Sequence, residues 1–197
     1  MSSLAELAVR LGIRVTGSDV AESRVTRRLA GKGITVQIGH SVENLGNVDA
    51  LVYSSAIDPE NPELLEAEVR RIPLLHRSDL LNLMMGSRTG ITIAGTHGKS
   101  TVTGMVGTIL RAGGEAPSLA AGVEIPGLGG SSLAGKGRFF VAEADESDRS
   151  FLKYRPYAGI VTCVDNDHLN NYRDIEDIGE AFLHHLNAIS REGASVC

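Results

Sequence analysis

The stretch that most constrains the fold is residues 91–101, which read I-T-I-A-G-T-H-G-K-S-T. Its first four residues form a short, largely β-branched run, which is typical of a buried strand. Gly95 marks the point where this strand must turn, and a helix is predicted from Thr101 onward. A strand, a glycine-rich turn and a helix in this order predict an α/β fold.

The turn itself predicts a phosphate site. Two of its four residues, Gly95 and Gly98, lack a Cβ, so its backbone N–H groups can be presented to an anion. Lys99 would supply a point charge to the outer phosphates, and the hydroxyl of Ser100 would ligate Mg²⁺. The spacing is G-x-x-G-K-S rather than the usual G-x-x-x-x-G-K-[ST]. The interpretation therefore depends on the flanking strand and helix, and the alternative is an ordinary glycine-rich turn.

Composition excludes several classes of protein. A net charge of −5 and an aromatic content of 4% provide neither the basic surface nor the stacking platforms that nucleic-acid binding requires. Residues 1–11 are too polar for a signal peptide, and no 18-residue apolar run is present for a membrane span. We therefore expect a cytoplasmic protein with no nucleic-acid or membrane partner. Cys163 lies in the apolar run 159–164 and is predicted to be a core residue.

Short apolar runs alternate with helical patterns in the N-terminal half, which is typical of a doubly wound parallel sheet. Asp19 follows a predicted strand at 13–16, where nucleotide-binding units hold a ribose or base. Its alternative role is a turn or N-cap residue. No strand or glycine-rich turn precedes the first predicted helix, at 4–11, so we expect an incomplete and weakly stable domain.

A small, polar stretch at residues 86–90 marks the predicted domain boundary. We expect a Rossmann-like domain over 1–86 and a P-loop domain over 87–197, both doubly wound parallel-sheet units and both incomplete. Within the second domain, the glycine-rich stretch 121–137 is predicted to be a mobile loop or a hairpin.

Polar residues follow the next two predicted strands, at 139–142 and 159–164. The carboxyl ends of parallel strands meet at one edge of the sheet, where ligands bind. Glu143 comes first off its strand and is the predicted Mg²⁺ ligand. After the other strand, oxygen chemistry alone favours Asp167 over His168.

Three motifs in this order and spacing resemble the Mur ligases of peptidoglycan synthesis, and in particular the alanine-adding type. They are G-T-H-G-K-S-T at 95–101, E-A-D-E-S-D-x-S-F-L at 143–152 and D-N-D-H at 165–168. The resemblance implies an N-terminal UDP-binding domain, a central ATPase domain and a C-terminal domain. The family's G-x-G-G-x-G loop and C-terminal domain are absent here, so we expect a fragment.

The resemblance also implies roles for individual residues. Mg²⁺ would be held by Ser100, Glu143 and His168, which replaces the chemical preference for Asp167. Ser54 and Ser55 match a loop near the UDP-sugar. His97 lies beside the reacting carboxylate and is, with Lys99, an implied catalytic residue. The implied ATP-binding residues are Gly95, Thr96, His97, Gly98, Lys99, Ser100 and Thr101.

The implied reaction has two steps. ATP phosphorylates the carboxylate of UDP-N-acetylmuramate, and the amine of L-alanine then attacks the acyl phosphate. A murein-peptide ligase and a folylpolyglutamate synthetase are alternatives within the enzyme class, and the signature at 143–152 argues against the latter. A nucleotide-binding remnant without turnover is the alternative outside it.

Overall fold

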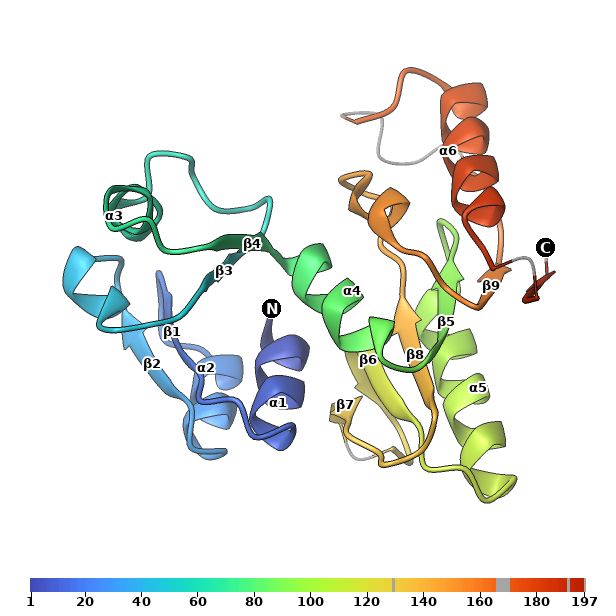
Figure 1. The fold of residues 1–197 in the computed structure, drawn as a ribbon, viewed down its shortest axis with the longest axis horizontal. Helices are drawn as coiled ribbons and strands as arrows, with labels where there is room; N and C mark the ends of the chain where they lie inside the picture. Colours follow the sequence, from blue (N-terminus) through green and yellow to red (C-terminus); the bar gives the residue numbers. More distant parts are fainter. Residues whose placement is uncertain (129, 166–170, 191, 197) are drawn as a thin grey trace. The chain divides into compact units, whose positions relative to one another are not determined.

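The computed structural model describes residues 1–128, 130–165, 171–190 and 192–196. The chain divides into two compact units, Met1–Leu80 and Leu81–Cys197 (Figure 1). Both units combine parallel strands with helices, so the predicted α/β class is confirmed. The predicted boundary between residues 86 and 87 stays a prediction.

The first unit contains two small parallel sheets, β1 with β2 and β3 with β4. The helix α4, Arg77–Gly86, leads from it into the second unit. In chain order, its elements are α1 Ser2–Arg10, β1 Thr16–Asp19, α2 Arg24–Ala30, β2 Thr35–Ile38, the 3-10 helix η1 Val42–Leu45, β3 Leu51–Tyr53, α3 Pro62–Val69 and β4 Leu74–His76.

The strand β1 starts later than the sequence predicted. The predicted strand covered residues 13–16, but the N–H of Ile13 donates to the carbonyl of Ala8 at 3.0 Å and so helps to end α1. Gly12 has a φ of 86°, which continues that turn. The chain is therefore free to extend only from Thr16 onward, and β1 runs to Asp19.

A buried carboxylate joins α1 to α2. Glu6 is 1% exposed. Its two oxygens accept from Arg28 Nε at 3.0 Å and from Lys32 Nζ at 2.5 Å. Because an unpaired buried charge is costly, these two cations help to stabilise Glu6 inside the first unit.

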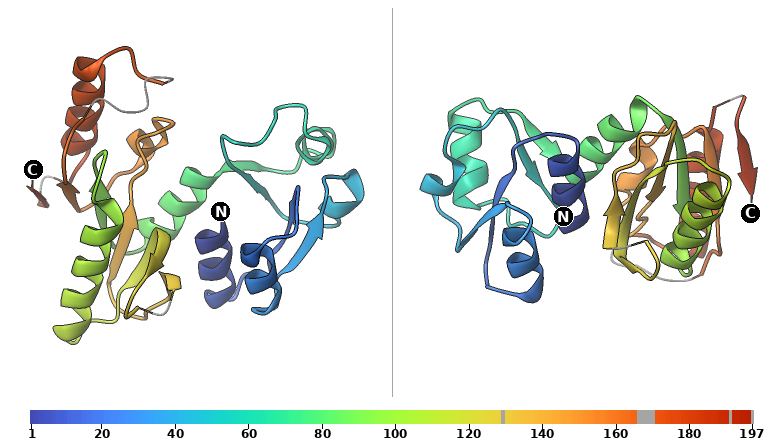
Figure 2. Two further views of the ribbon diagram at one scale, coloured as in Figure 1. Left: turned by 180° about the vertical axis from the view of Figure 1, so that it is seen from behind. Right: turned by 90° about the horizontal axis from the view of Figure 1, so that it is seen from below.

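The second unit is built on a six-stranded sheet in the order β10-β9-β5-β8-β6-β7 (Figure 2). The pairing of β6 with β7 is antiparallel, so the glycine-rich stretch contains the hairpin that was one of its two predicted forms. The elements are β5 Thr89–Ala94, α5 Lys99–Ala112, β6 Ser118–Ile125, β7 Gly130–Leu133, β8 Phe139–Glu143, the 3-10 helix η2 Ser150–Lys153, β9 Ala158–Val161, α6 Ile175–Asn187 and β10 Ala194–Val196.

The helices α5 and α6 cover opposite faces of this sheet. Ile93 of β5 belongs to the hydrophobic core against which Val102 and Val106 of α5 pack. The neighbouring Thr92 hydrogen-bonds with His185 of α6, with 3.0 Å between Thr92 Oγ1 and His185 Nε2. Since successive strand residues point to opposite faces, β5 is covered on both sides.

Two glycines let α5 lie close to the sheet. A Cβ at Gly104 would come within 2.8 Å of Ile125, and one at Gly107 within 2.7 Å of Leu119. Such distances are too short for carbon–carbon contacts, so a larger residue would require the helix or these two side chains to shift. None of the helices in the described part of the chain has the length and apolar character needed to cross a bilayer.

The buried His185 makes the stability of the second unit dependent on pH. Burial lowers its pKa from 6.5 to about 4. The unfolded chain therefore binds a proton at this histidine more readily than the folded chain does. The contribution of His185 to stability is fully present above pH 6.5 and is lost as the pH falls toward 4. We expect this residue to contribute up to about 3 kcal/mol to the pH dependence of the free energy of unfolding.

Urea denaturation of wild type and His185→Gln at several pH values between these limits measures this contribution. His184→Gln is the matched control, because His184 is the adjacent residue and is exposed. An equal pH dependence in wild type and His185→Gln would contradict the prediction.

Candidate functional site

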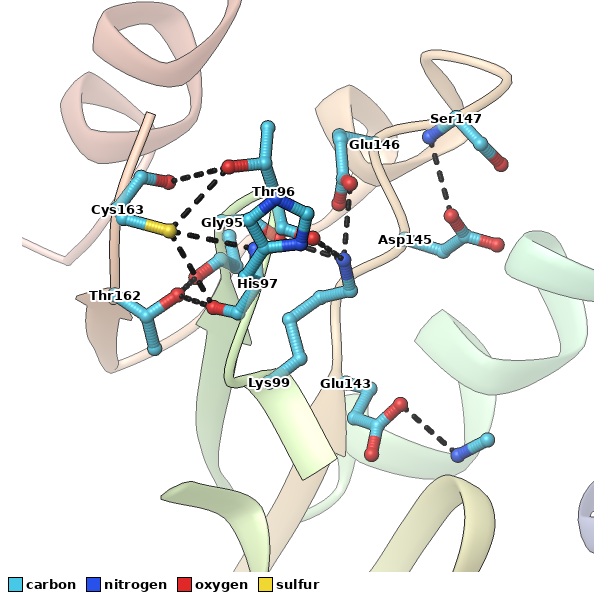
Figure 3. A network of polar contacts seen from close by, with 12 residues as sticks. Gly95, Thr96, His97, Lys99, Glu143, Asp145, Glu146, Ser147, Thr162 and Cys163 are labelled. Carbon is cyan, nitrogen blue, oxygen red and sulfur yellow. Dashed lines mark hydrogen bonds and ion pairs between the residues drawn. The ribbon is translucent and has the colours of Figure 1, made fainter. Parts of the chain in front are cut away.

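The carboxyl ends of three parallel strands meet at one edge of the six-stranded sheet. Ile93 of β5 pairs in register with Glu143 at the end of β8, and Ala94 pairs with Val161 at the end of β9. The loops that follow these strands therefore emerge side by side. Figure 3 shows their side chains converging around the turn after β5.

The turn after β5 requires glycine at Gly95. Its φ is 126°, and a Cβ there would lie 2.2 Å from Thr162 Oγ1 and 2.9 Å from the carbonyl oxygen of Cys163. Gly98 has a φ of 82° and is the N-cap of α5. The first N–H groups of a helix have no acceptor within the helix, so this turn and the start of α5 can bind an anion.

Lys99 is the first residue of α5, and its side chain folds back over the turn (Figure 3). Its ammonium group donates to the carbonyl of Gly95 at 2.6 Å and to that of Thr96 at 3.3 Å. It also forms an ion pair with Glu146 Oε1 at 2.9 Å. These three partners match the three donors of an ammonium group, so its positive charge is held at the turn.

The loop after β9 braces the same turn. The N–H of Thr96 donates to the carbonyl of Cys163 at 3.0 Å, and the N–H of Thr162 donates to that of Ala94 at 3.0 Å. The hydroxyl of Thr162 donates to the carbonyl of His97. The backbone of His97 is thereby held, while the residue itself is exposed.

Cys163 is exposed, so its predicted place in the core is wrong. The strand β9 ends at Val161, three residues before the end of the apolar run 159–164, and Cys163 lies in the loop beyond it. The thiol contacts Thr96 Oγ1 at 3.3 Å and accepts from the N–H of His97 at 3.3 Å. These hydrogen bonds lower the pKa of the Cys163 thiol.

Glu143 has the surroundings expected of a cation ligand. Its Oε2 accepts from the N–H of Gly122 at 3.0 Å, whereas its buried Oε1 has no hydrogen-bond partner. A buried carboxylate oxygen without a partner is costly, and carboxylate oxygens are the ligands that Mg²⁺ prefers. No cluster of three His, Cys, Asp or Glu residues suited to a metal occurs within the described residues. Asp167 and His168 lie outside those residues.

The acidic loop after β8 is held by residues that precede or begin α6. Glu146 is 0% exposed, and its carbonyl accepts from the hydroxyl of Tyr172 at 2.7 Å. Burial raises the pKa of Tyr172 to about 12. The guanidinium of Arg149 lies 4.4 Å from the centre of the Tyr172 ring and forms an ion pair with Asp177 of α6. The loop that carries Glu146 is therefore anchored by Tyr172 and Asp177 as well as by Lys99.

Sequence reasoning missed three of these residues, Glu146, Thr162 and Tyr172. Glu146 is one of four acidic residues between 143 and 148, and only its contact with Lys99 distinguishes it. Thr162 fell inside a predicted strand, and Tyr172 belongs to no motif. The one available signal was the position of Glu146 within the run E-A-D-E-S-D.

Ser54 and Ser55 lie in the first unit, directly after β3. Ser55 Oγ is 3.1 Å from Nε2 of His76, and the carbonyl of Ser54 accepts from the N–H of Ile57 at 3.0 Å. Their role near a UDP-sugar stays a prediction. Asp19 ends β1 and accepts from the N–H of Ala21 at 3.3 Å, whereas the N-cap of α2 is Ser23.

Two family profiles together match nearly the whole chain. The profile "Mur ligase family, catalytic domain" matches residues 1–89, and the profile "Mur ligase middle domain" matches residues 93–197. The chain belongs to the Mur ligase family. The resemblance inferred from the motifs at 95–101, 143–152 and 165–168 is thus confirmed.

Curated members of the family resemble the chain over its whole length. It is 45% identical over 196 residues to a UDP-N-acetylmuramate–L-alanine ligase of Geotalea uraniireducens, covering all of this chain and 43% of that protein. It is 46% identical over 197 residues to the ligase of that name from Carboxydothermus hydrogenoformans, again covering all of this chain and 42% of the relative. The chain thus spans less than half the length of these relatives.

Two solved structures of the family share the fold. The UDP-N-acetylmuramate-alanine ligase of Thermotoga maritima matches with a TM-score of 0.89 and 28% identity, covering 100% of this chain and 46% of that one. The UDP-N-acetylmuramate:L-alanyl-γ-D-glutamyl-meso-diaminopimelate ligase of Neisseria meningitides matches with a TM-score of 0.87 and 26% identity, covering 100% and 67%.

The contacts of Gly95 predict a large effect of Gly95→Ala. The added Cβ would collide with Thr162 and Cys163 and would also occupy an unfavourable φ, so we expect the free energy of unfolding to fall by about 2 kcal/mol or more. Gly114→Ala is the matched control, because its φ of 83° is also positive but its Cβ would meet open space. Urea denaturation compares the two variants. Equal losses would show that the close approach of Gly95 to the β9 loop is unimportant.

Proposed function

We propose that this chain carries the nucleotide and UDP-sugar sites of an ATP-dependent ligase that joins L-alanine to the carboxylate of UDP-N-acetylmuramate. The reaction would take place in the cytoplasm, in the synthesis of peptidoglycan precursors. The observation that carries the proposal is the turn at residues 95–98. This turn is hydrogen-bonded to the loop after β9, and its carbonyls accept from the Lys99 ammonium. The identity of about 45% to ligases of this name supports the choice of substrates.

The phosphates of ATP would bind at the turn between β5 and α5. The N–H groups at the start of α5 provide donors and the positive end of the helix dipole, whereas the N–H groups of Thr96 and His97 donate to Cys163. The ammonium of Lys99 already lies at this turn and would shift toward the outer phosphates. Charge neutralisation and alignment are what the transfer of a phosphoryl group mainly requires.

Mg²⁺ would be held by Glu143 and Ser100, with His168 as the third residue implied by the family resemblance. When bound, the ion would neutralise charge on the transferred phosphoryl group and help to orient it. The Oε1 of Glu143 fits this role because it is buried without a hydrogen-bond partner. Ser100 is the second residue of α5 and follows Lys99 directly.

The chemical steps need no covalent enzyme nucleophile. An oxygen of the muramoyl carboxylate attacks the γ-phosphorus of ATP and releases ADP, giving an acyl phosphate. The amine of L-alanine then attacks the acyl carbon, an amide forms, and inorganic phosphate leaves with the bonding electrons. His97 would lie beside the reacting carboxylate, and Ser54 and Ser55 would contact the UDP-sugar.

Two alternatives are favoured by specific observations. The similarity to the diaminopimelate-containing peptide ligase, at a TM-score of 0.87, favours a related murein-peptide ligase. The coverage of only 43% of a curated relative favours nucleotide binding without turnover by this chain alone. Phosphate release in the presence of ATP, UDP-N-acetylmuramate and either L-alanine or a peptide distinguishes these possibilities.

Removal of the Lys99 ammonium, in Lys99→Ala, should weaken nucleotide binding. We expect the purified 197-residue chain to bind a non-hydrolysable ATP analogue in the presence of Mg²⁺, and the variant to lose at least about a hundredfold in affinity. The reason is that the variant lacks the ammonium group that donates to the carbonyls of Gly95 and Thr96 in the turn. Calorimetric titration measures both affinities.

Lys136→Ala is the matched control for this titration. Lys136 is exposed and lies between β7 and the start of β8, so it precedes the strand that ends in Glu143. Its removal should leave affinity unchanged. If the folded wild-type chain shows no Mg²⁺-dependent binding, the proposed nucleotide site is wrong.

A further inference from the structure

Lys99 follows the turn at residues 95–98, which we call the phosphate turn. It is paired with a buried acid, Glu146, that no step of the proposed reaction uses. Glu146 is 0% exposed, and its Oε1 lies 2.9 Å from Lys99 Nζ. The Lys99 side chain is only 18% exposed. At this burial the pair is weakly screened by solvent, so each charge cancels much of the field of the other.

The pairing of Lys99 with Glu146 lowers the net positive charge that an incoming anion meets at the turn. Lys99 contributes one positive charge, while Glu143 and Glu146 each contribute one negative charge at the ends of the same strands. Together these three groups have a net charge of −1 when both acids are ionised. A polyphosphate that brings no cation therefore gains less from Lys99, whereas one that carries Mg²⁺ offers the acids a partner.

Glu146 is held in this place by a separate set of contacts. The hydroxyl of Tyr172 donates to its carbonyl at 2.7 Å, and Asn171 Nδ2 donates to the carbonyl of Ser147 at 2.8 Å. Arg149, three residues further on, is paired with Asp177. The backbone that carries this acid is thus held by contacts that do not involve Lys99.

We propose that Glu146 makes the phosphate turn selective for nucleotides complexed with a divalent cation, because it neutralises Lys99 whenever no cation accompanies the phosphates. Glu146 is in this view a specificity-determining residue that acts through Lys99. The inference rests on the proposed function, since it assumes that the turn binds a nucleotide.

The test is the metal dependence of ADP binding by the 197-residue chain. Affinity is measured by calorimetry with Mg²⁺ and again with EDTA, for wild type and for Glu146→Gln. Glutamine keeps the shape of the side chain and an oxygen that can accept from Lys99, but it removes the negative charge. We expect its affinity for metal-free ADP to rise about tenfold and that for Mg²⁺-ADP to change less than about threefold.

The matched control is Glu176→Gln, which removes one negative charge from an exposed residue in the first turn of α6. It should leave the ratio of the two affinities as in wild type. Thermal unfolding of each variant shows whether the fold is retained.

The outcomes separate the inference from the function on which it rests. A lower metal dependence in Glu146→Gln but not in Glu176→Gln supports the proposal. An unchanged ratio in Glu146→Gln, an equal change in both variants, or weaker binding under both conditions would overturn it while leaving the nucleotide site intact. A folded wild-type chain that binds no ADP with Mg²⁺ would overturn the proposed function and the inference together.

Discussion

The parallel pairing of β5 with both β8 and β9 is the constraint on which the site depends. Because these strands run in the same direction and in register, Ala94, Glu143 and Val161 end at one edge of the sheet. The turn after β5 can then be braced by the loop after β9 and faced by the acids after β8. The close approach of Thr162 and Cys163 is also what requires glycine at position 95. The same packing between β5 and β9 therefore determines both the path of the turn and the residue required at position 95.

This arrangement holds the turn in place by contacts within the protein. The backbone of the turn donates to the β9 loop, and the Lys99 ammonium occupies all three of its donors on Gly95, Thr96 and Glu146. Little conformational entropy then remains to be lost when an anion binds, which favours affinity. The contact with Glu146 opposes this effect for an anion alone, because Lys99 must give up a buried partner before it can serve the phosphate.

Two acids three residues apart have acquired different surroundings. Glu143 is the last residue of β8, and one of its oxygens is buried without a partner, which suits a cation. Glu146 lies in the following loop, fully buried against Lys99. Both are glutamates, yet the surroundings of Glu143 suit a cation from outside the protein, whereas Glu146 is paired with the protein's own Lys99. The sequence shows only that the run is acidic, and the contacts distinguish one acid from the other.

The sequence by itself determined the α/β class, the turn at residues 95–98 and the position of Glu143, because strand, glycine and helix signals are local along the chain. Only the tertiary structure decided which acid pairs with Lys99, since the regular alternation of a strand does not extend into the loop after β8. The same holds for Cys163, which is exposed because β9 ends before it, and for His185, which is buried because Thr92 faces α6. Each of these outcomes depends on a partner that is at least 40 residues away, and no local pattern contains that information.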